Sequence, residues 1–239
     1  MDPVFVFGSN LAGRHGAGAA KFAREWRGAG QGVGEGATGR SYAIPTKDAD
    51  LKTLPFAAIE ASVKRFIDYA KAHESEVFQI TKVGCGLAGL TDDQVAPLFT
   101  DVPKNCHIPG VWLARQYPLL MRVIIAGGRD YANADFMQST LDHAYRKWMD
   151  KDLMIITGGA RGADTLAEKW AVGRGIHTRR FEARWDRYGK LAGPFRNQAM
   201  AWFSNYVVAF PGHKGTLNMI ATAKANGLKT HVITAPKTA

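Results

Sequence analysis

An alternation of short apolar runs with helix-like segments through residues 121–239 constrains the fold more than any other feature of this chain. The apolar runs lie at 122–126, 153–157, 177–181, 206–210 and 230–233. The segments with helical periodicity lie between them, at 134–149, 163–175, 194–203 and 216–226. Strands that alternate with helices predict a doubly wound parallel sheet, in which ligands bind beyond the carboxyl ends of the strands.

The amino-terminal half repeats this alternation in a shorter form. The apolar runs at 4–7, 41–45 and 77–83 predict strands, and the periodic segments at 16–26, 55–73 and 92–99 predict helices. This order predicts an α/β layer sandwich. The glycine-rich segment 28–40 cannot form a helix, and we interpret it either as a flap over a nearby pocket or as a flexible connection.

Composition excludes several classes of protein. Hydrophobic residues make up 46% of the 239 residues and charged residues 22%, which suits folded cores and excludes a disordered chain. The apolar runs are too short to span a bilayer and the amino terminus does not resemble a secretory signal, so we expect a cytoplasmic protein with no membrane partner. Cys85 and Cys106 are too few for a disulfide framework and are expected to be reduced; no cluster predicts a metal site.

The net charge of +10 is concentrated in the second half of the chain. Residues 1–120 contain 13 basic and 12 acidic residues, whereas residues 121–239 contain 18 basic and 9 acidic residues. A positive field of this kind attracts the phosphates of a nucleotide or of a nucleic acid, and it also serves solubility alone.

Glycine-rich loops follow three predicted strands of the second half, at 127–131, 158–164 and 211–216. Glycine lets the backbone approach a phosphate, and the first turn of a helix offers unpaired N–H groups. The spacing matches neither the dinucleotide fingerprint nor the P-loop, which argues against ordinary NAD-dependent redox chemistry and ATP hydrolysis. Arg196 lies at the start of another helix, where its planar guanidinium can clamp a phosphate or a ribose. We therefore expect a nucleotide site at this edge of the sheet.

Together these motifs resemble the SLOG superfamily, specifically its YspA-like branch, across nearly all of residues 121–235. The resemblance implies a Rossmann-like fold, a homo-oligomer formed through this domain, and relatives that are phosphoribohydrolases, nucleotide sensors in anti-phage defence or DNA-processing proteins. Hydrolytic members carry Pro-Gly-Gly-x-Gly-Thr-x-x-Glu and an upstream arginine. Here Arg196 matches the arginine, but His213 replaces a glycine and Met219 replaces the glutamate. Because a thioether cannot activate water, the resemblance implies binding and puts this hydrolysis in doubt.

The residues of this half that we expect to bind the ligand all lie in or beside these motifs. They are Gly127, Gly128, Arg129, Gly158, Gly159, Arg161, Gly162, Asp164, Arg196, Asn197, Pro211, Gly212, His213, Lys214, Gly215 and Thr216.

Two glycine turns of the first half, at 8–20 and 84–90, resemble those of macro domains, the ADP-ribose-binding family. The resemblance covers roughly residues 3–112 and implies a macro-like α/β/α sandwich, with a ribose held by Asn10. One hydrolytic macro subgroup has an acidic residue where this chain has Ala88, and Lys47 stands roughly where that subgroup places its nucleophile. Half of a lysine–carboxylate pair predicts little activity. The expected ligand-binding residues are Gly8, Ser9, Asn10, Gly16, Gly18, Gly84, Cys85, Gly86 and Leu87.

Other residues that attract attention have simpler interpretations. His15 and His213 are expected to be solvated loop histidines, and Cys85 a small residue packed in a tight turn. Trp185 and Tyr188, in a basic loop, are candidates for stacking on a base.

We therefore expect a macro-like domain over 1–114 followed by a Rossmann-like SLOG domain over 121–239. The function predicted is binding of an NAD-derived or other small nucleotide, such as ADP-ribose or a cyclic nucleotide signal, as would suit phage–host conflict or NAD metabolism. The nucleotide is the ligand, and no further cofactor is expected. One alternative is a hydrolase of N-glycosidic or ADP-ribosyl bonds, with Arg196 or Lys47 as its weak catalytic candidates. Another is single-stranded nucleic-acid binding by the basic half.

Overall fold

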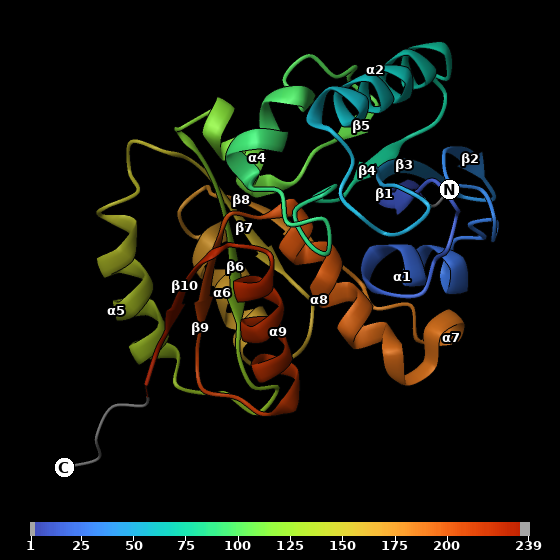
Figure 1. The fold of residues 1–239 in the computed structure, drawn as a ribbon. Helices are drawn as coiled ribbons and strands as arrows, with labels where there is room; N and C mark the ends of the chain where they lie inside the picture. The colour runs from blue at the N-terminus through green and yellow to red at the C-terminus, as the bar shows by residue number, and fades with distance from the viewer. Residues whose placement is uncertain (1–2, 235–239) are drawn as a thin grey trace. The chain divides into compact units, whose positions relative to one another are not determined.

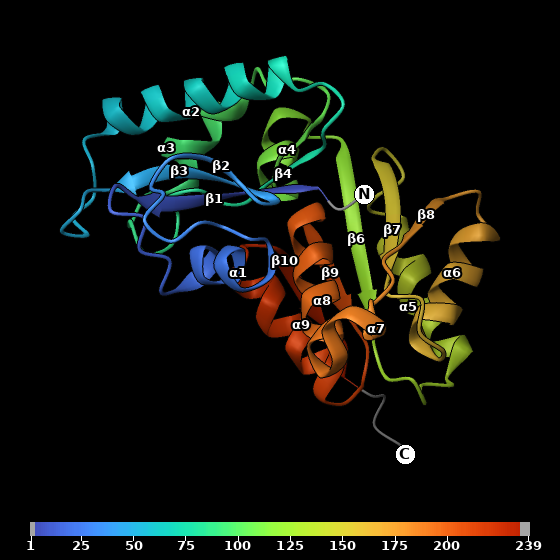
Figure 2. The ribbon, with the colours of Figure 1, turned by 90° about the vertical axis from the view of Figure 1, so that its right-hand side faces the viewer.

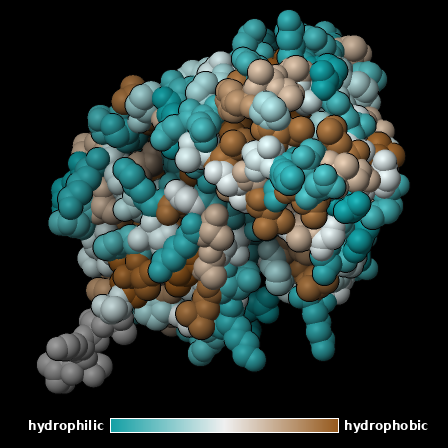
Figure 3. Space-filling model, viewed as in Figure 1, coloured by the Kyte–Doolittle hydropathy of each residue, from teal (hydrophilic) through white to brown (hydrophobic). Residues whose placement is uncertain are grey.

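The computed structural model describes residues 3–234, and the chain divides into two compact units, Met1–Trp112 and Leu113–Ala239 (Figure 1). The division falls within helix α4 (Gly110–Gln116). Each unit contains a five-stranded sheet, and the predicted α/β class with two sheets is confirmed. Among residues 3–234, no helix has the length and apolarity needed to cross a membrane. On the face drawn in Figure 3, apolar residues are interspersed with hydrophilic ones.

The amino-terminal unit has the strand order β2-β3-β1-β4-β5. Its strands are β1 (Val4–Asn10), β2 (Gly36–Thr38), β3 (Ser41–Lys47), β4 (Phe78–Ile80) and β5 (Cys106–His107). All pairs are parallel except β2 with β3. Helix α1 (Gly18–Trp26) lies on one face of the sheet and α2 (Phe56–Ala72) on the other (Figure 2). The face of α2 that carries Ile59, Val63 and Phe66 is fully buried, as its periodicity predicts.

Two elements of this unit are shorter than predicted. Strand β4 ends at Ile80, because Val83 N–H bonds the Thr81 carbonyl and turns the chain. The helix begun by the Thr91 capping box, α3 (Asp92–Val95), changes after one turn to the 3₁₀ helix η1 (Ala96–Phe99), where Pro97 has no N–H to continue the α-helical ladder.

The glycine-rich segment 28–40 is neither a flap over the pocket nor a free connection. It contributes edge strand β2, Gly30 N–H bonds Thr38 Oγ1 at 2.9 Å, and the Ser9 hydroxyl donates to the Gly34 carbonyl. A Cβ at Gly34 would lie 2.6 Å from the Asn10 carbonyl oxygen. Glycine is therefore used here for close backbone packing.

The carboxyl-terminal unit has the strand order β10-β9-β6-β7-β8, with every pair parallel. Its strands are β6 (Leu120–Ala126), β7 (Asp152–Thr157), β8 (His177–Arg180), β9 (Tyr206–Ala209) and β10 (Lys229–Val232). Its longer helices are α5 (Ala134–Tyr145), α6 (Ala163–Val172), α8 (Ala192–Phe203) and α9 (Lys214–Ala225), and the short α7 (Trp185–Tyr188) and η2 (Gly189–Leu191) precede α8. The chain direction across the sheet reverses between β6 and β9, the switch point at which doubly wound sheets bind ligands.

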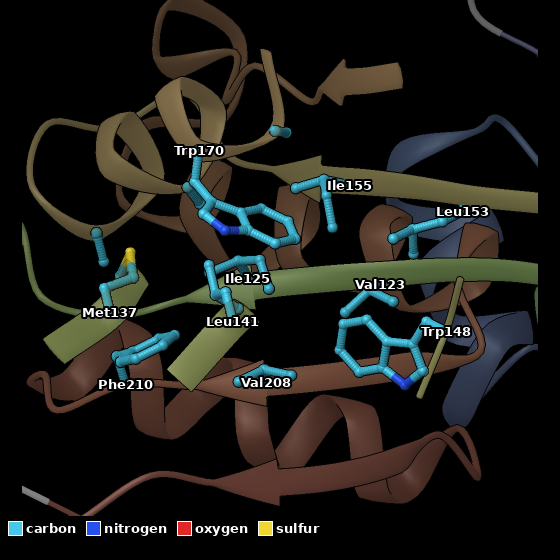
Figure 4. Close-up of a cluster of buried hydrophobic side chains, with 13 residues drawn as sticks. Val123, Ile125, Met137, Leu141, Trp148, Leu153, Ile155, Trp170, Val208 and Phe210 are labelled. Atoms are coloured by element: carbon cyan, nitrogen blue, oxygen red, sulfur yellow. The ribbon is translucent and has the colours of Figure 1, made fainter. Parts of the chain in front are cut away.

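Helices α5 and α6 cover one face of this sheet, and α8 and α9 cover the other (Figure 2). On the α5–α6 side, Trp148 and Trp170 pack with Ile125, Leu141 and Phe210 in one buried cluster (Figure 4). This core holds the strand ends, and hence the loops that follow them, in fixed positions.

Candidate functional site

The loops that follow β6, β7 and β9 meet at the switch point around a cavity of about 620 Å³, which we call the switch-point cavity. Twelve of the residues predicted to bind a ligand line it: Gly127, Gly128, Arg129, Gly158, Arg161, Asp164, Arg196, Asn197, His213, Lys214, Gly215 and Thr216. Four others, Gly159, Gly162, Pro211 and Gly212, do not.

Glycines of the three loops, both inside and outside the cavity lining, hold the loops against one another. Gly128 N–H bonds the Pro211 carbonyl at 2.9 Å, and Ala163 N–H bonds the Gly128 carbonyl at 3.1 Å. A Cβ at Gly212 would lie 2.6 Å from Gly128 N, and Gly162 has a φ of +78°. Gly162 and Gly212 are therefore required by loop packing.

A carboxylate of the chain itself occupies the amides of the loop after β7. Asp164 is buried, and its Oδ2 accepts the N–H groups of Gly158 at 3.0 Å and Ala160 at 3.1 Å. Burial raises the pKa of Asp164, and these bonds and the charge of Arg196 partly oppose that rise. The loop that sequence reasoning assigned to a phosphate thus already holds an anion at two of its amides.

The guanidinium of Arg196 lies directly over Gly158, where any Cβ would collide with it. Its Nε donates to Asn197 Oδ1 at 3.1 Å, and its two terminal nitrogens have no protein hydrogen-bond partner among the described residues. Burial lowers its pKa, and the charge of Asp164 opposes that shift. Asn197 is itself fixed, because its Nδ2 donates to Asn218 Oδ1 at 2.8 Å. Arg196 is thus a held cation with free donors facing the cavity.

Three further cations line the cavity without an ion pair to any described residue: Arg129, Arg161 and Lys214. Lys214 opens helix α9, and Gly215 and Thr216 of its first turn, where helical N–H groups have no intrahelical partner, line the same cavity. At the rim, exposed His213 contacts exposed Asp130 at 3.2 Å, and this bond holds the pKa of Asp130 below its usual value.

The floor of the cavity is apolar. Ile125, Met200 and Met219 line it and are almost fully buried. Met219 stands where hydrolytic SLOG members have glutamate, so this position supplies no carboxylate. Trp185 lines the cavity and is 52% exposed, whereas Tyr188, the other stacking candidate, packs edge-on against Phe195 and does not line it.

The amino-terminal unit has its own cavity of about 330 Å³, which we call the amino-unit cavity. Eight predicted residues line it: Gly8, Ser9, Asn10, Gly16, Gly18, Gly84, Gly86 and Leu87. Arg14, Lys47 and Lys82 also line it, and no carboxylate does. Lys82 is paired with Asp92 at 2.8 Å, while Arg14 and Lys47 have no ion pair to a described residue.

Several predicted residues of this unit have structural roles. The amide of Asn10 closes the following loop, with Nδ2 donating to the Arg14 carbonyl at 2.7 Å and Oδ1 accepting Arg14 N–H at 3.0 Å. Cys85 does not line the cavity, and its thiol points to the Val83 carbonyl at 3.6 Å. His15 is not solvated as predicted: it is 1% exposed, packs edge-on against Phe7, and burial lowers its pKa.

Sequence reasoning missed several lining residues, some of which lie inside the glycine motifs. In the amino-unit cavity the missed residues are Arg14, Ala17, Ala19, Ala20, Thr46, Leu51, Thr81, Lys82 and Ala88. In the switch-point cavity they include Asp130, Ala160, Pro194, Met200 and Asn218. The rule that ligands bind at strand ends would have found Thr46 and Thr81, which lie at or just beyond the ends of β3 and β4. Within residues 3–234, no three His, Cys, Asp or Glu side chains are grouped to hold a metal ion.

Parts of this chain are similar to known proteins. Residues 121–188 match the YAcAr family, described as the YspA, cpYpsA-related SLOG family. The Gene 61 protein of Mycobacterium phage D29 is 30% identical over 118 residues, covering 46% of this chain and 93% of the phage protein. Among solved structures, DNA processing protein A from Streptococcus pneumoniae aligns with a TM-score of 0.42 at 15% identity, over 63% of this chain and 69% of that one. The structural genomics target TM1055 aligns with a TM-score of 0.37 at 16% identity, over 46% of this chain and 72% of that one.

The carboxyl-terminal unit is a Rossmann-like domain with a cavity at the switch point of its sheet. The chain belongs to the family of the phage Gene 61 protein, and its residues 121–188 match the SLOG family. The SLOG resemblance is thereby confirmed for that segment, and the macro-domain resemblance of the first half stays a prediction.

Proposed function

We propose that this protein binds a small nucleotide in the switch-point cavity. The observation that carries the proposal is Arg196, a half-buried guanidinium whose free donors face a cavity beside the first turn of α9. A phosphate there receives charged hydrogen bonds from Arg196 and Lys214 and backbone bonds from Gly215 and Thr216. The apolar floor and Trp185 suit a base.

The ligand we favour is NAD-derived, such as ADP-ribose, or a cyclic nucleotide signal. A role in phage–host conflict is part of this proposal, and its only support is that the Gene 61 relative is a protein of a phage. We propose binding rather than hydrolysis, because Met219 and Ala88 stand where the resembled hydrolytic groups have acidic residues.

We propose that the amino-unit cavity is a second, macro-like site for an ADP-ribose-type anion. The cations Arg14 and Lys47 face it, and no carboxylate among its lining residues opposes them. The N–H groups of Gly86, Leu87 and Ala88 have no hydrogen-bond partner among the described residues, so they are available to a phosphate.

Calorimetric titration of the full chain tests this proposal. The titrants are ADP-ribose, cyclic ADP-ribose isomers, AMP and ADP, with a single-stranded oligonucleotide as comparison. We expect saturable binding of a nucleotide, with up to two ADP-ribose molecules per chain. Binding of the oligonucleotide alone, with a steep salt dependence, would instead assign the basic half to nucleic acid. If no nucleotide binds, the proposed function is wrong.

A further inference from the structure

A second cavity of about 530 Å³ adjoins the switch-point cavity, and we call it the side cavity. The two cavities share six lining residues: Arg129, Gly158, Ala160, Arg161, Trp185 and Arg196. We propose, building on the proposed function, that one ligand spans both cavities: a nucleoside diphosphate that carries a sugar-like, hydroxyl-rich group on its second phosphate.

The two cavities differ in chemistry. The switch-point cavity has the apolar floor of Ile125, Met200 and Met219, which suits a base. The side cavity has no such floor, and the residues that it does not share are Gly159, Arg180, Glu182 and Ala183. An apolar group therefore fits the first cavity and a polar group fits the second.

The boundary between the cavities is cationic. Arg129, Arg161 and Arg196 line both cavities, and none of them has an ion pair to a described residue. A guanidinium pairs with two phosphate oxygens at once, so three of them at one boundary suit a diphosphate better than a single phosphate. Arg180 is different, because Glu168 pairs with it and holds it in place.

Glu182 selects the group that the second phosphate carries. It lines the side cavity and is exposed, and no described cation is within ion-pair distance of it. Its charge acts on Arg180 in the same cavity wall, but its carboxylate oxygens still accept hydrogen bonds from hydroxyl groups and repel a third phosphate. The side cavity therefore favours a sugar over the terminal phosphate of a triphosphate.

Trp185 lies where the two cavities meet. It is 52% exposed, and a Cβ at Gly193 would lie 3.5 Å from its ring, so the ring lies close to the backbone of α8 at one edge. Such a ring can stack on a base or a sugar that extends past the arginines.

The test is calorimetry of the full chain with AMP, ADP, ATP and ADP-ribose. It uses a Lys47→Glu background, which adds a carboxylate to the amino-unit cavity and so removes that site. We expect ADP-ribose to bind at least about 10-fold more tightly than AMP, and ATP to bind no more tightly than ADP. Ala183→Phe, which fills the side cavity, should lower the affinity for ADP-ribose to that for ADP. It should leave the affinity for AMP unchanged. Val172→Phe, on an exposed position of α6, is its matched control.

Glu182→Gln gives a reading that does not depend on a bulky substitution. This substitution should weaken the binding of ADP-ribose and strengthen the binding of ATP, each by about 3-fold or more. Equal affinities for AMP and ADP-ribose, or no change of the ADP-ribose to ATP ratio in Glu182→Gln, would overturn the two-cavity inference while leaving the proposed function intact. Absence of binding by all four nucleotides would overturn the proposed function itself.

Discussion

Each unit has a glycine-bordered cavity at the ends of its strands, but the two cavities offer different groups to bind an anion. The switch-point cavity has four cations and two carboxylates among its lining residues, Asp130 and Asp164. The amino-unit cavity has three cations and no carboxylate. In the switch-point cavity, the buried Asp164 accepts hydrogen bonds from two loop N–H groups. Only side chains and the first turn of α9 are then available to bind a phosphate. In the second, loop amides remain free of any described partner.

The contrast shows that the sequence of a glycine loop before a helix does not reveal whether its amides bind a ligand anion or a carboxylate of the chain itself. The loop at 158–162 looks like a phosphate-binding loop in sequence, but the residue two positions beyond it supplies the anion internally. The electrostatic consequence is local: a ligand phosphate in the carboxyl-terminal unit must bind nearer to Arg196 and α9 than to the amides of Gly158 and Ala160.

Glycines that serve packing in each unit should give the strongest response to substitution. Gly13 has a φ of +62°, and its Cβ would lie 2.7 Å from Gly32 Cα; Gly162 has a φ of +78°, and its Cβ would lie 2.6 Å from the Arg129 carbonyl oxygen. Alanine at either position should lower the free energy of unfolding by about 3 kcal/mol or more, through backbone strain and collision.

Denaturant unfolding measures these changes, and glycines of the same two units whose Cβ positions are open serve as controls. Nothing lies within 4 Å of a Cβ at Gly16 or at Gly215. Alanine there should change the free energy of unfolding by no more than about 1 kcal/mol. Equal losses for all four variants would show that the glycines are not distinguished by packing.

Removing one cation from each site should lower nucleotide affinity to different extents in the two sites. Arg196→Ala should weaken nucleotide binding in the carboxyl-terminal unit by about 10- to 100-fold, because a half-buried fork loses charged hydrogen bonds. Lys47→Ala should weaken binding at the amino-unit site by only about 3- to 10-fold, because an ammonium acts as a single point charge and not as a planar fork. Calorimetry on each variant, with Arg196→Lys as the charge-preserving control, checks this order. A reversed order would contradict the distinction between the two cavities.

Removing the internal anion should make the two cavities more alike. In Asp164→Asn the amide oxygen still accepts the two loop N–H groups, while the charge beside Arg196 is lost. Nucleotide affinity should rise by about 3-fold or more, as measured by calorimetry. Unchanged affinity would mean that Asp164 does not oppose the ligand.

The same variant carries a pH signature. Because burial raises the pKa of Asp164, the folded protein keeps this proton at pH values where the unfolded chain, with its ordinary pKa of 3.8, has lost it. The stability that this contributes is present below pH 3.8 and is lost as the pH rises through the raised pKa. The Asp164→Asn variant should not lose this stability. The curves of unfolding free energy against pH for the unsubstituted protein and for Asp164→Asn should therefore diverge above pH 3.8. Parallel curves would contradict the assignment.

The weakest effect concerns the rim of the switch-point cavity. His213→Ala should leave the unfolding transition unchanged, because the contact with Asp130 is exposed at both side chains. It should nevertheless let the pKa of Asp130 return toward its ordinary value. Carboxyl-detected NMR titration measures this, and an unmoved Asp130 titration would show that His213 is not its partner in solution.

Local patterns were sufficient to predict the strand ladder of the carboxyl-terminal unit. Each of its strands alternates with a helix long enough to show a buried stripe, and doubly wound order follows from that alternation. The meeting of the loops at 127–131, 158–162 and 211–216 follows from the same rule.

The predictions that failed depend on contacts between distant residues. His15 is buried because Phe7 and the backbone of Gly30 and Val33 lie against it. Gly34 is fixed by a hydrogen bond from Ser9 across 25 positions of sequence. The Asp164 bonds are closer in sequence, and an aspartate in the first turn of a helix is a signal from which an already occupied loop could have been predicted.

A crystal structure of the full chain with ADP bound would decide where the phosphate lies. We expect phosphate oxygens within hydrogen-bond distance of the Arg196 guanidinium and of the α9 first-turn amides, with Asp164 still bonded to Gly158 and Ala160. A phosphate seated on the Gly158 and Ala160 amides with Asp164 displaced, or ADP bound away from the switch point, would contradict the binding mode proposed for the carboxyl-terminal unit.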